Sequence, residues 1–288
     1  MNYKTPTPTT SSRHLDLTRA MSLSKTHYSK STPFTQEQRT ILKKWSAEQL
    51  ALKSRLILTD DTLKTKPHFI AGVDISFFHG NSNRAVASLV IVQVLPEGKI
   101  KTVYEGYDTR VQMTEPYIAG YLAFRELKPL LGLFAKVKIT NPEYWPDVVV
   151  VDGNGTLHQR GFGLASHLGV ELDIPTIGVG KSLLVVPRLG VVDSDRFRVQ
   201  SWARKAKPLD ALPLGSVNGK PVACAIKVGN TSQTVFISQG HRVSLEMALR
   251  VVRLVGCQKD TCEVVRLADR KSRDLIKRIE WENRIDRK

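Results

Sequence analysis

Apolar and polar positions along the chain repeat with two different periods, and together these periods predict an α/β protein. Apolar residues recur at helical spacing after Thr35, where the capping-box pattern TQEQ predicts the start of a helix. Three strands are predicted next, over residues 69–76, 85–95 and 99–108. The Pro-Glu-Gly turn between the last two strands indicates an antiparallel meander.

The next part of the pattern alternates helices with strands. Residues 120–134 predict a helix with leucines along one face, and the valine run at 148–151 predicts a strand buried on both faces. The later elements expected are a short helix over 161–169, a strand over 174–179, a strand over 234–238, a helix over 244–255 and a helical tail after Lys271.

Three strands followed by helix, strand, helix and strand is the order of a ribonuclease H-like fold, an α/β architecture in which helices flank a mixed sheet. We expect one such domain over residues 35–270. A basic, Ser/Thr-rich extension over residues 1–34 is expected to be disordered because it lacks sustained periodicity. Residues 271–288 are expected to form a charged C-terminal tail.

Composition favours a polyanionic partner. The 288 residues carry 43 Lys and Arg against 27 Asp and Glu, a formal charge of +16. Nucleic acid explains this excess most simply, although an anionic membrane or solubility alone also accounts for it. No apolar segment approaches the roughly 20 residues that span a bilayer, so we expect a soluble protein without membrane association.

The three cysteines, Cys224, Cys257 and Cys262, show neither metal-ligand spacing nor a disulfide framework. We expect these cysteines to be buried and to pack as small apolar side chains. We also expect the protein to be intracellular, in the cytoplasm or the nucleus. The N-terminal extension, with few acids and scattered Arg and Ser, leaves organellar targeting open.

Carboxylates occupy positions that apolar strands disfavour. Asp74 stands inside an apolar strand, and Asp152 ends the valine strand. In a ribonuclease H-like fold these aspartates and Glu126 meet at one edge of the sheet, where a cation relieves their repulsion. Oxygen ligands suit Mg²⁺ or Mn²⁺. Separately, Asp152 is also typical of a turn cap, and Glu126 of a surface residue paired with Arg125 or Lys128.

Long motifs in the same order resemble the endonuclease V family, nucleases that act on nucleic acid containing inosine, which is deaminated adenine. The resemblance extends from about residue 35 to residue 269. It is carried by AGVDIS at 71–76, EPYIAGYLAFRE at 115–126, VDGNGTLHQRGFGLASHLGV at 151–170, PTIGVGKSLL at 175–184 and GHRVSLEMAL at 240–249.

The resemblance implies a ribonuclease H-like fold and Mg²⁺-dependent hydrolysis, with Mn²⁺ as a substitute. It also implies cleavage of the second phosphodiester bond on the 3′ side of inosine, leaving 3′-hydroxyl and 5′-phosphate ends, in repair or in turnover of inosine-containing RNA. The expected partner is therefore single- or double-stranded nucleic acid containing inosine, bound by a monomer. DNA or RNA preference depends on contacts to 2′-hydroxyls and stays open.

Matching positions imply a set of site residues. Asp74, Glu126 and Asp152 match the metal-binding and catalytic acids. Lys181 matches a lysine near the scissile phosphate, and His241 matches a histidine near the metals. The positions expected to contact nucleic acid are Tyr117, Gly153, Gly155, His158, Arg160, His167, Gly178 and Lys181, with Gly180 as a further backbone position.

Physical chemistry agrees with several of these roles. An aromatic wedge at Tyr117 would fill the space left by an unstacked base. Glycine lets backbone N–H groups approach a base or phosphate closely. For these residues the alternatives are structural: Tyr117 packs at a helix entrance, and His158 and His167 form hydrogen bonds inside the protein.

Two positions depart from the family pattern. Ala119 and Gln159 stand where the family usually has proline. Since proline stiffens a turn, we expect Ala119 to give a looser wedge and lower selectivity while cleavage persists, and Gln159 leaves the loop geometry near Arg160 open. The alternative functions are a ribonuclease H-like structure-selective nuclease without inosine preference, a non-catalytic inosine-binding module, and an actin-like ATPase, for which no second matching subdomain is evident.

Overall fold

The computed structural model describes residues 34–63 and 66–285. The disordered extension expected over residues 1–34 thus lies outside the described residues, except for Phe34. The chain divides into two compact units, Met1–Lys43 and Lys44–Lys288, and the division falls within the first described helix, α2 (Gln36–Lys53). The predicted capping box is present, because Thr35 Oγ1 accepts from the Gln38 N–H at 3.2 Å and Gln38 Oε1 accepts from the Thr35 N–H at 3.0 Å.

The larger unit is built on a mixed sheet, which in the described residues has eight strands in the order β3-β2-β1-β4-β5-β8-β7-β6. β1, β2 and β3 form the predicted antiparallel meander, β4 and β5 continue parallel to β1, and β8 returns antiparallel to β5. This order confirms the ribonuclease H-like fold. The strands are β1 (Phe69–Phe78), β2 (Asn81–Val94), β3 (Ile100–Gln112), β4 (Val148–Asp152), β5 (Thr176–Gly180), β6 (Ala211–Leu214), β7 (Ala223–Lys227) and β8 (Thr234–His241).

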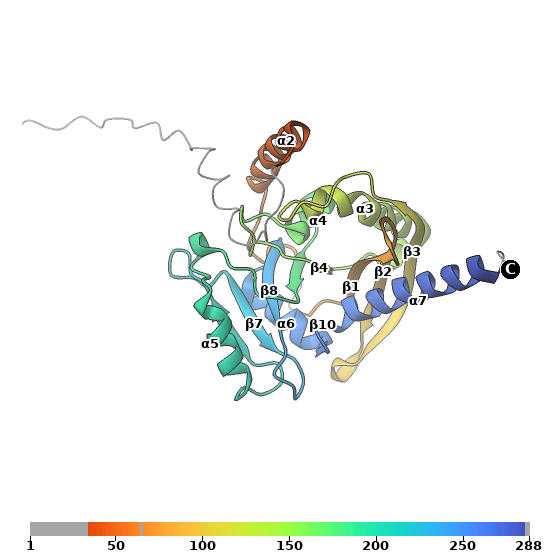
Figure 1. Cartoon of the computed structure of the whole chain (residues 1–288). Coiled ribbons are helices and arrows are strands. Elements are labelled where there is room, and N and C mark those ends of the chain that lie inside the picture. Colours follow the sequence, from red (N-terminus) through yellow and green to blue (C-terminus); the bar gives the residue numbers. More distant parts are fainter. Residues whose placement is uncertain (1–33, 64–65, 286–288) are drawn as a thin grey trace, which may run out of the picture. The chain divides into compact units, whose positions relative to one another are not determined.

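Helices cover both faces of this sheet (Figure 1). α3 (Leu122–Thr140) and α4 (Leu164–Leu172) pack on one face, and α6 (Leu245–Val255) and α7 (Glu263–Ile285) on the other. Successive strand residues point to opposite faces. Val148 and Val150 therefore join the core under α6 and α7, whereas Val149 and Val151 join the core under α3 and α4. This is why the valine run is apolar throughout.

Some elements have no clear signal in the sequence. α5 (Ser194–Ala203) is mostly polar, β6 contains Pro213, and the hairpin of β9 (Cys257–Gln258) and β10 (Thr261–Cys262) is very short. α7 begins at Glu263 and continues without a break past Lys271, so the predicted helical tail is part of a longer helix packed on β1 and β2. Among the described helices, none has both the length and the apolarity to cross a bilayer.

Candidate nuclease site

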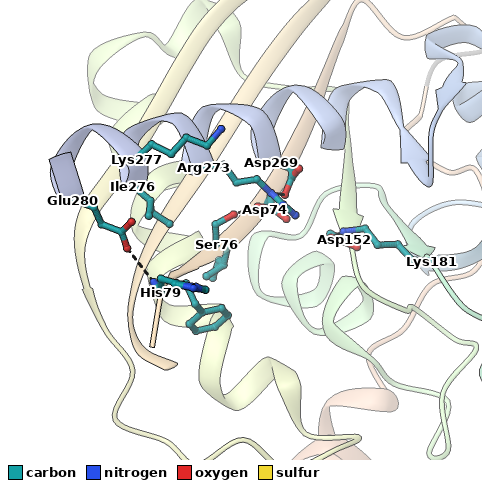
Figure 2. Close-up of a pocket in the computed structure, with 12 residues that line it drawn as sticks. Asp74, Ser76, His79, Asp152, Lys181, Asp269, Arg273, Ile276, Lys277 and Glu280 are labelled. Carbon is teal, nitrogen blue, oxygen red and sulfur yellow. Dashed lines mark hydrogen bonds and ion pairs between the residues drawn. The ribbon is translucent and has the colours of Figure 1, made fainter. Parts of the chain in front are cut away.

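Asp74 and Asp152 lie side by side on neighbouring parallel strands. Val73 of β1 is in register with Val151 of β4, so the aspartates are the next residue on each strand. Parallel strands are about 4.8 Å apart, which places both carboxylates at the carboxyl edge of β4, where ligands bind in α/β sheets. Figure 2 shows both side chains facing one pocket.

Hydroxyl groups orient Asp74. Its side chain is only 6% exposed, and Oδ2 accepts from the Ser76 hydroxyl and from the Ser272 hydroxyl, each at 3.1 Å. Ser272 belongs to α7, which crosses over β1, and is itself fully buried. The polar interruption in β1 is therefore matched by polar partners from a distant segment.

Glu126 is buried on α3, where the charges of Asp74 and Asp152 act on it. Its side chain is 9% exposed on α3. Burial, and then repulsion by Asp74 and Asp152, raises the pKa of Glu126 to about 8. Burial, followed by repulsion from Asp152 and Asp269, raises the pKa of Asp74 to about 7. The structure thus places Asp74 and Asp152 on adjacent strands, and their charges act on Glu126.

Asp269 is an acidic residue of this site that the sequence interpretation missed. It lies on α7, lines the same pocket of about 500 Å³, and is paired with Arg273 at 2.6 Å. α7 buries Val265, Ala268 and Ser272 against the sheet, so a residue beside that stripe reaches the pocket edge. The helical spacing is the available signal, but Asp269 is one of five acidic residues on α7, and a charged residue on an amphipathic helix is usually a surface residue.

Lys181 provides the positive charge next to these acids. It directly follows β5, and its Nζ lies 2.6 Å from Asp152 Oδ2. Burial acts to lower the pKa of Lys181, but the charges of Asp152, Asp74 and Asp269 outweigh it, and the pKa is raised. Lys181 is therefore fully protonated and half-exposed at the pocket.

The donor chemistry of this cluster suits a hard divalent cation. All the acidic groups offer carboxylate oxygens, and burial, followed by repulsion between the carboxylates, raises the pKa of Asp74 and of Glu126 to near or above neutral pH. In the described part of the chain, no three His, Cys, Asp or Glu side chains are arranged so that they could hold a metal ion together. Lys181 contacts Asp152, so the carboxylate side chains would have to rearrange in order to gather their oxygens around an ion.

Tyr117 stands on the loop between β3 and α3 and is 70% exposed. The neighbouring Ile118 is buried and anchors the loop. Behind them a tight turn closes where the Tyr121 N–H donates to the Ile118 carbonyl at 3.0 Å, with Gly120 at φ +81°. An exposed aromatic ring on an anchored loop is compatible with the predicted wedge.

The predicted nucleic-acid contacts at His158, Arg160 and His167 lie mainly inside the protein. His158 Nε2 is 3.0 Å from the Gly120 carbonyl, and the Arg160 guanidinium carbon is 3.9 Å from the centre of the Tyr121 ring. His167 is buried near the rings of Phe124 and Phe162. These side chains support the Tyr117 loop and the core beneath it.

The glycines serve close packing within the protein. The Gly153 N–H donates to the Val179 carbonyl at 2.9 Å, and the Gly155 N–H donates to Ser238 Oγ at 3.0 Å. A Cβ on Gly178 would lie 2.3 Å from Gly155 N. The loop after Asp152 therefore requires glycine in order to lie directly on β5, and its first N–H groups already have partners. A Cβ on Gly180 would likewise meet Asn154 Oδ1 at 2.9 Å.

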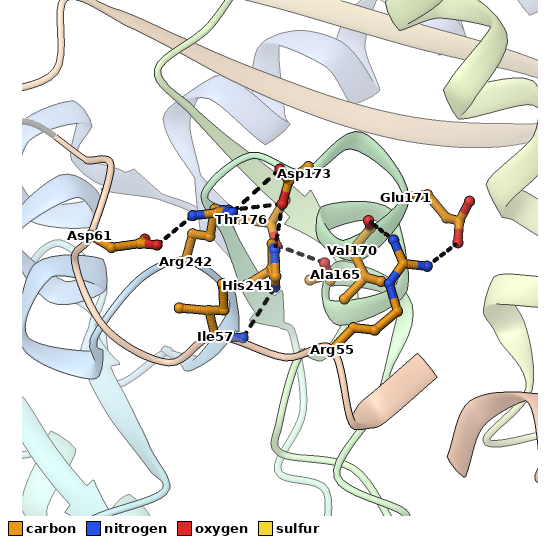
Figure 3. Close-up of polar contacts among 10 residues, drawn as sticks. All are labelled: Arg55, Ile57, Asp61, Ala165, Val170, Glu171, Asp173, Thr176, His241 and Arg242. Carbon is orange, nitrogen blue, oxygen red and sulfur yellow. Dashed lines mark hydrogen bonds and ion pairs between the residues drawn. The ribbon is translucent and has the colours of Figure 1, made fainter. Parts of the chain in front are cut away.

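His241 lies away from the acids. It ends β8, in register with Thr176, whereas Asp152 is in register with Val179. Three residues along β5 correspond to about 10 Å. His241 Nδ1 accepts from the Ile57 N–H, and Nε2 is 3.3 Å from Asp173 Oδ1 (Figure 3). The structure does not bring this residue together with Asp74, Glu126 and Asp152.

Comparison with known proteins agrees with this architecture. The family model for Endonuclease V matches residues 50–270. Endonuclease V of Mus musculus is 39% identical over 242 residues, which cover 81% of this chain and 69% of that protein. Endonuclease V of Homo sapiens is 38% identical over 241 residues, covering 81% and 83%.

Solved structures are similar over the same region. The catalytic domain of human Endonuclease V has a TM-score of 0.73 and 37% identity, with 83% of this chain and 97% of that chain covered. A Ciona intestinalis Endonuclease V variant has a TM-score of 0.76 and 31% identity, covering 85% and 100%. That variant was crystallised with a 23-mer DNA containing an inosine followed by a ribo-adenosine.

Proposed function

Because the chain belongs to the endonuclease V family, we propose that it is a Mg²⁺-dependent endonuclease specific for nucleic acid that contains inosine. It hydrolyses the second phosphodiester bond on the 3′ side of inosine and leaves 3′-hydroxyl and 5′-phosphate ends. The observation that carries this proposal is the placement of Asp74 and Asp152 on adjacent strands beside one pocket, with their charges acting on the buried Glu126 of α3.

The acids fit a divalent cation by their chemistry. Asp74, Asp152 and Glu126 would hold it, with Asp269 close to Asp74. A bound Mg²⁺, or Mn²⁺ in its place, supplies positive charge against the phosphate and the leaving oxygen. Ser76 and Ser272 keep Asp74 Oδ2 in place while the charge around it changes.

Lys181 would act directly on the scissile phosphate. Its ammonium group is a point charge on a flexible stem, and it stands beside Asp152 at the pocket edge. A phosphate oxygen would compete with Asp152 for this charge, so Lys181 would release Asp152 as substrate enters. Arg273 and Lys277 line the same pocket and add positive potential for the flanking phosphates.

Tyr117 would separate the target base from its neighbour. A base inside a stack must be unstacked before its Watson–Crick edge is inspected, and this costs a few kcal/mol. An exposed ring on an anchored loop can occupy the vacated space. Inosine lowers the cost further because hypoxanthine pairs less well than adenine.

Cleavage of matched strands tests the proposal. Single-stranded RNA and DNA oligonucleotides, each with one inosine or with adenine at that position, are incubated with the protein in Mg²⁺ and without it. We expect cutting 3′ to inosine only when Mg²⁺ is present. Equal cutting of the adenine strands would contradict the specificity, and full activity of Asp152→Asn would contradict the site. The RNA and DNA arms give the sugar preference.

A further inference from the structure

The loop that carries Tyr117 is fastened at its first residues by Arg125. This arginine is buried on α3, next to Glu126. Its guanidinium donates to the Glu115 carbonyl and, on the other side, to the Ser82 carbonyl of β2. Both acceptors are backbone groups, so the contact fixes the path of the chain and not only a side chain.

The last residues of the same loop are fastened through the Gly120 carbonyl. This oxygen accepts from Gln49 Nε2 at 3.3 Å, from His158 Nε2 at 3.0 Å and from the Arg160 guanidinium. A carbonyl only accepts, so His158 carries its proton on Nε2, and its Nδ1 accepts from the Arg160 N–H at 3.2 Å. Burial, and then the charge of Arg160, lowers the pKa of His158 to about 3, so this contact persists over the physiological range.

Gln49 connects the Gly120 carbonyl to the rest of the domain. It is 1% exposed, and its Nε2 also donates to the Phe162 carbonyl at 3.1 Å, while its Oε1 accepts from Arg160 Nε. The carbonyls of Gly120 and Phe162 require a donor, and the Arg160 guanidinium requires an acceptor. The side-chain amide of Gln49 can therefore take only one of its two orientations. Trp45, one turn earlier on the same helix, stacks on Phe124 at 4.8 Å between ring centres.

The turn from Ile118 to Tyr121, which lies between these contacts, contains one residue whose backbone is not restricted. Closure from Ile118 to Tyr121 with Gly120 at φ +81° is the geometry of a type II turn, in which proline is favoured at the second residue. That residue is Ala119, and alanine does not fix φ. The Ala119 N–H donates to no other described residue, so nothing in the hydrogen bonding excludes proline.

We infer that Gln49, His158 and Arg160 form a carbonyl clamp on Gly120 that supplies the stiffness which Ala119 does not. With Arg125 at the other end, the clamp sets the position of the Tyr117 ring and thereby the discrimination of inosine from adenine. These are positioning residues that act through Tyr117. The inference rests on the proposed function and names what determines its specificity.

Gln49→Met tests the clamp because it keeps the buried volume and removes the amide. Gln239→Met is the matched control, since Gln239 Nε2 also donates to two carbonyls, those of Leu58 and Val243, but away from the Tyr117 loop. The ratio of kcat/KM for inosine over adenine strands should fall about tenfold in Gln49→Met, the size expected for losing one or two hydrogen bonds. The Mg²⁺ dependence should not change. Adding Ala119→Pro to Gln49→Met should restore the ratio.

Hydrogen exchange of the backbone amides of Tyr117, Ile118, Gly120 and Tyr121 provides a readout that needs no substrate. Exchange should become about tenfold faster in Gln49→Met and return toward the wild-type rate with Ala119→Pro. Unchanged exchange and an unchanged ratio would overturn the clamp, as would an equal loss of activity on both strands. If the wild-type protein ignores inosine, the proposed specificity fails, and exchange alone then decides whether the clamp exists.

Discussion

The Ser272 hydroxyl donates to Asp74 Oδ2 at 3.1 Å, across 198 residues of sequence. Its bond lowers the pKa of Asp74, opposing the burial and repulsion that raise it. Since a carboxylate must be ionised to bind a cation, this serine supports the reactive form of the site. α7 thus contributes a hydrogen-bond donor to Asp74 although its sequence is that of a charged amphipathic helix.

Ser272→Ala should shift the activity profile toward higher pH. Without the hydroxyl, the pKa of Asp74 rises further, and kcat/KM at neutral pH should fall about tenfold while the loss narrows at alkaline pH. Ser166→Ala is the matched control, because Ser166 is also fully buried but its hydroxyl has no hydrogen-bond partner among the described residues. An equal loss at every pH would argue against this role for Ser272.

The metal-free protein should become less stable as pH rises from about 4 to about 8. Folding raises the pKa of Asp74 to about 7 and that of Glu126 to about 8. The folded state therefore binds more protons than the unfolded state across this window, and its stability is greatest below the unfolded values. Urea unfolding at pH 5 and pH 9 measures the difference, and Mg²⁺ should restore stability at pH 9.

Glu126→Gln should remove part of this pH dependence. A neutral amide avoids the buried charge, so the metal-free variant should be more stable than wild type at pH 9 by on the order of 2 kcal/mol. Cleavage should be lost at the same time. Glu246→Gln, on an exposed side chain of α6, is the control. A variant no more stable than wild type would show that Glu126 is not charged at this pH or has an unseen partner.

Asp269→Asn should weaken the use of Mg²⁺. The charge of Asp269 acts on Asp74, and both line one pocket. Removing it should raise the Mg²⁺ concentration for half-maximal activity about tenfold, in line with the loss of a supporting carboxylate. Asp274→Asn on the same helix is the control, because Asp274 is exposed and lies 3.9 Å from Lys277. The same Mg²⁺ requirement in both variants would remove Asp269 from the site.

Much of this fold and site could be predicted because the informative residues break a pattern. Asp74 interrupts an apolar strand, and Asp152 ends one, so their chemistry stands out against the period of two. The order of strands and helices then places them together. Asp269 and Gln49 break no pattern, since a polar residue is ordinary on a helix, and only the packing of α2 and α7 shows their importance.

A sequence motif also does not show in which direction its strand runs within the sheet. His241 was expected near the metals because it matches a family position, but β8 runs antiparallel to β5 and carries this residue to the opposite end of the sheet. The N–H groups of Gly153 and Gly155 were expected to face a nucleotide and instead bond to β5 and β8. A glycine-rich sequence indicates that another group lies close to the backbone, but it does not show whether that group is a ligand or another part of the protein.

His241→Asn separates a structural role from the catalytic role that the sequence predicts. The Ile57 N–H donates to Nδ1, so Nε2 carries the proton and donates to Asp173, which also pairs with Arg242 at 2.8 Å. Losing these bonds should lower the free energy of unfolding by about 1–3 kcal/mol. The folded variant should keep kcat/KM within about threefold of wild type, whereas Lys181→Ala should lose about a hundredfold with little change in stability. Activity is measured well below the melting temperature of each variant. A stable His241→Asn protein with a hundredfold loss of kcat would instead establish the catalytic role.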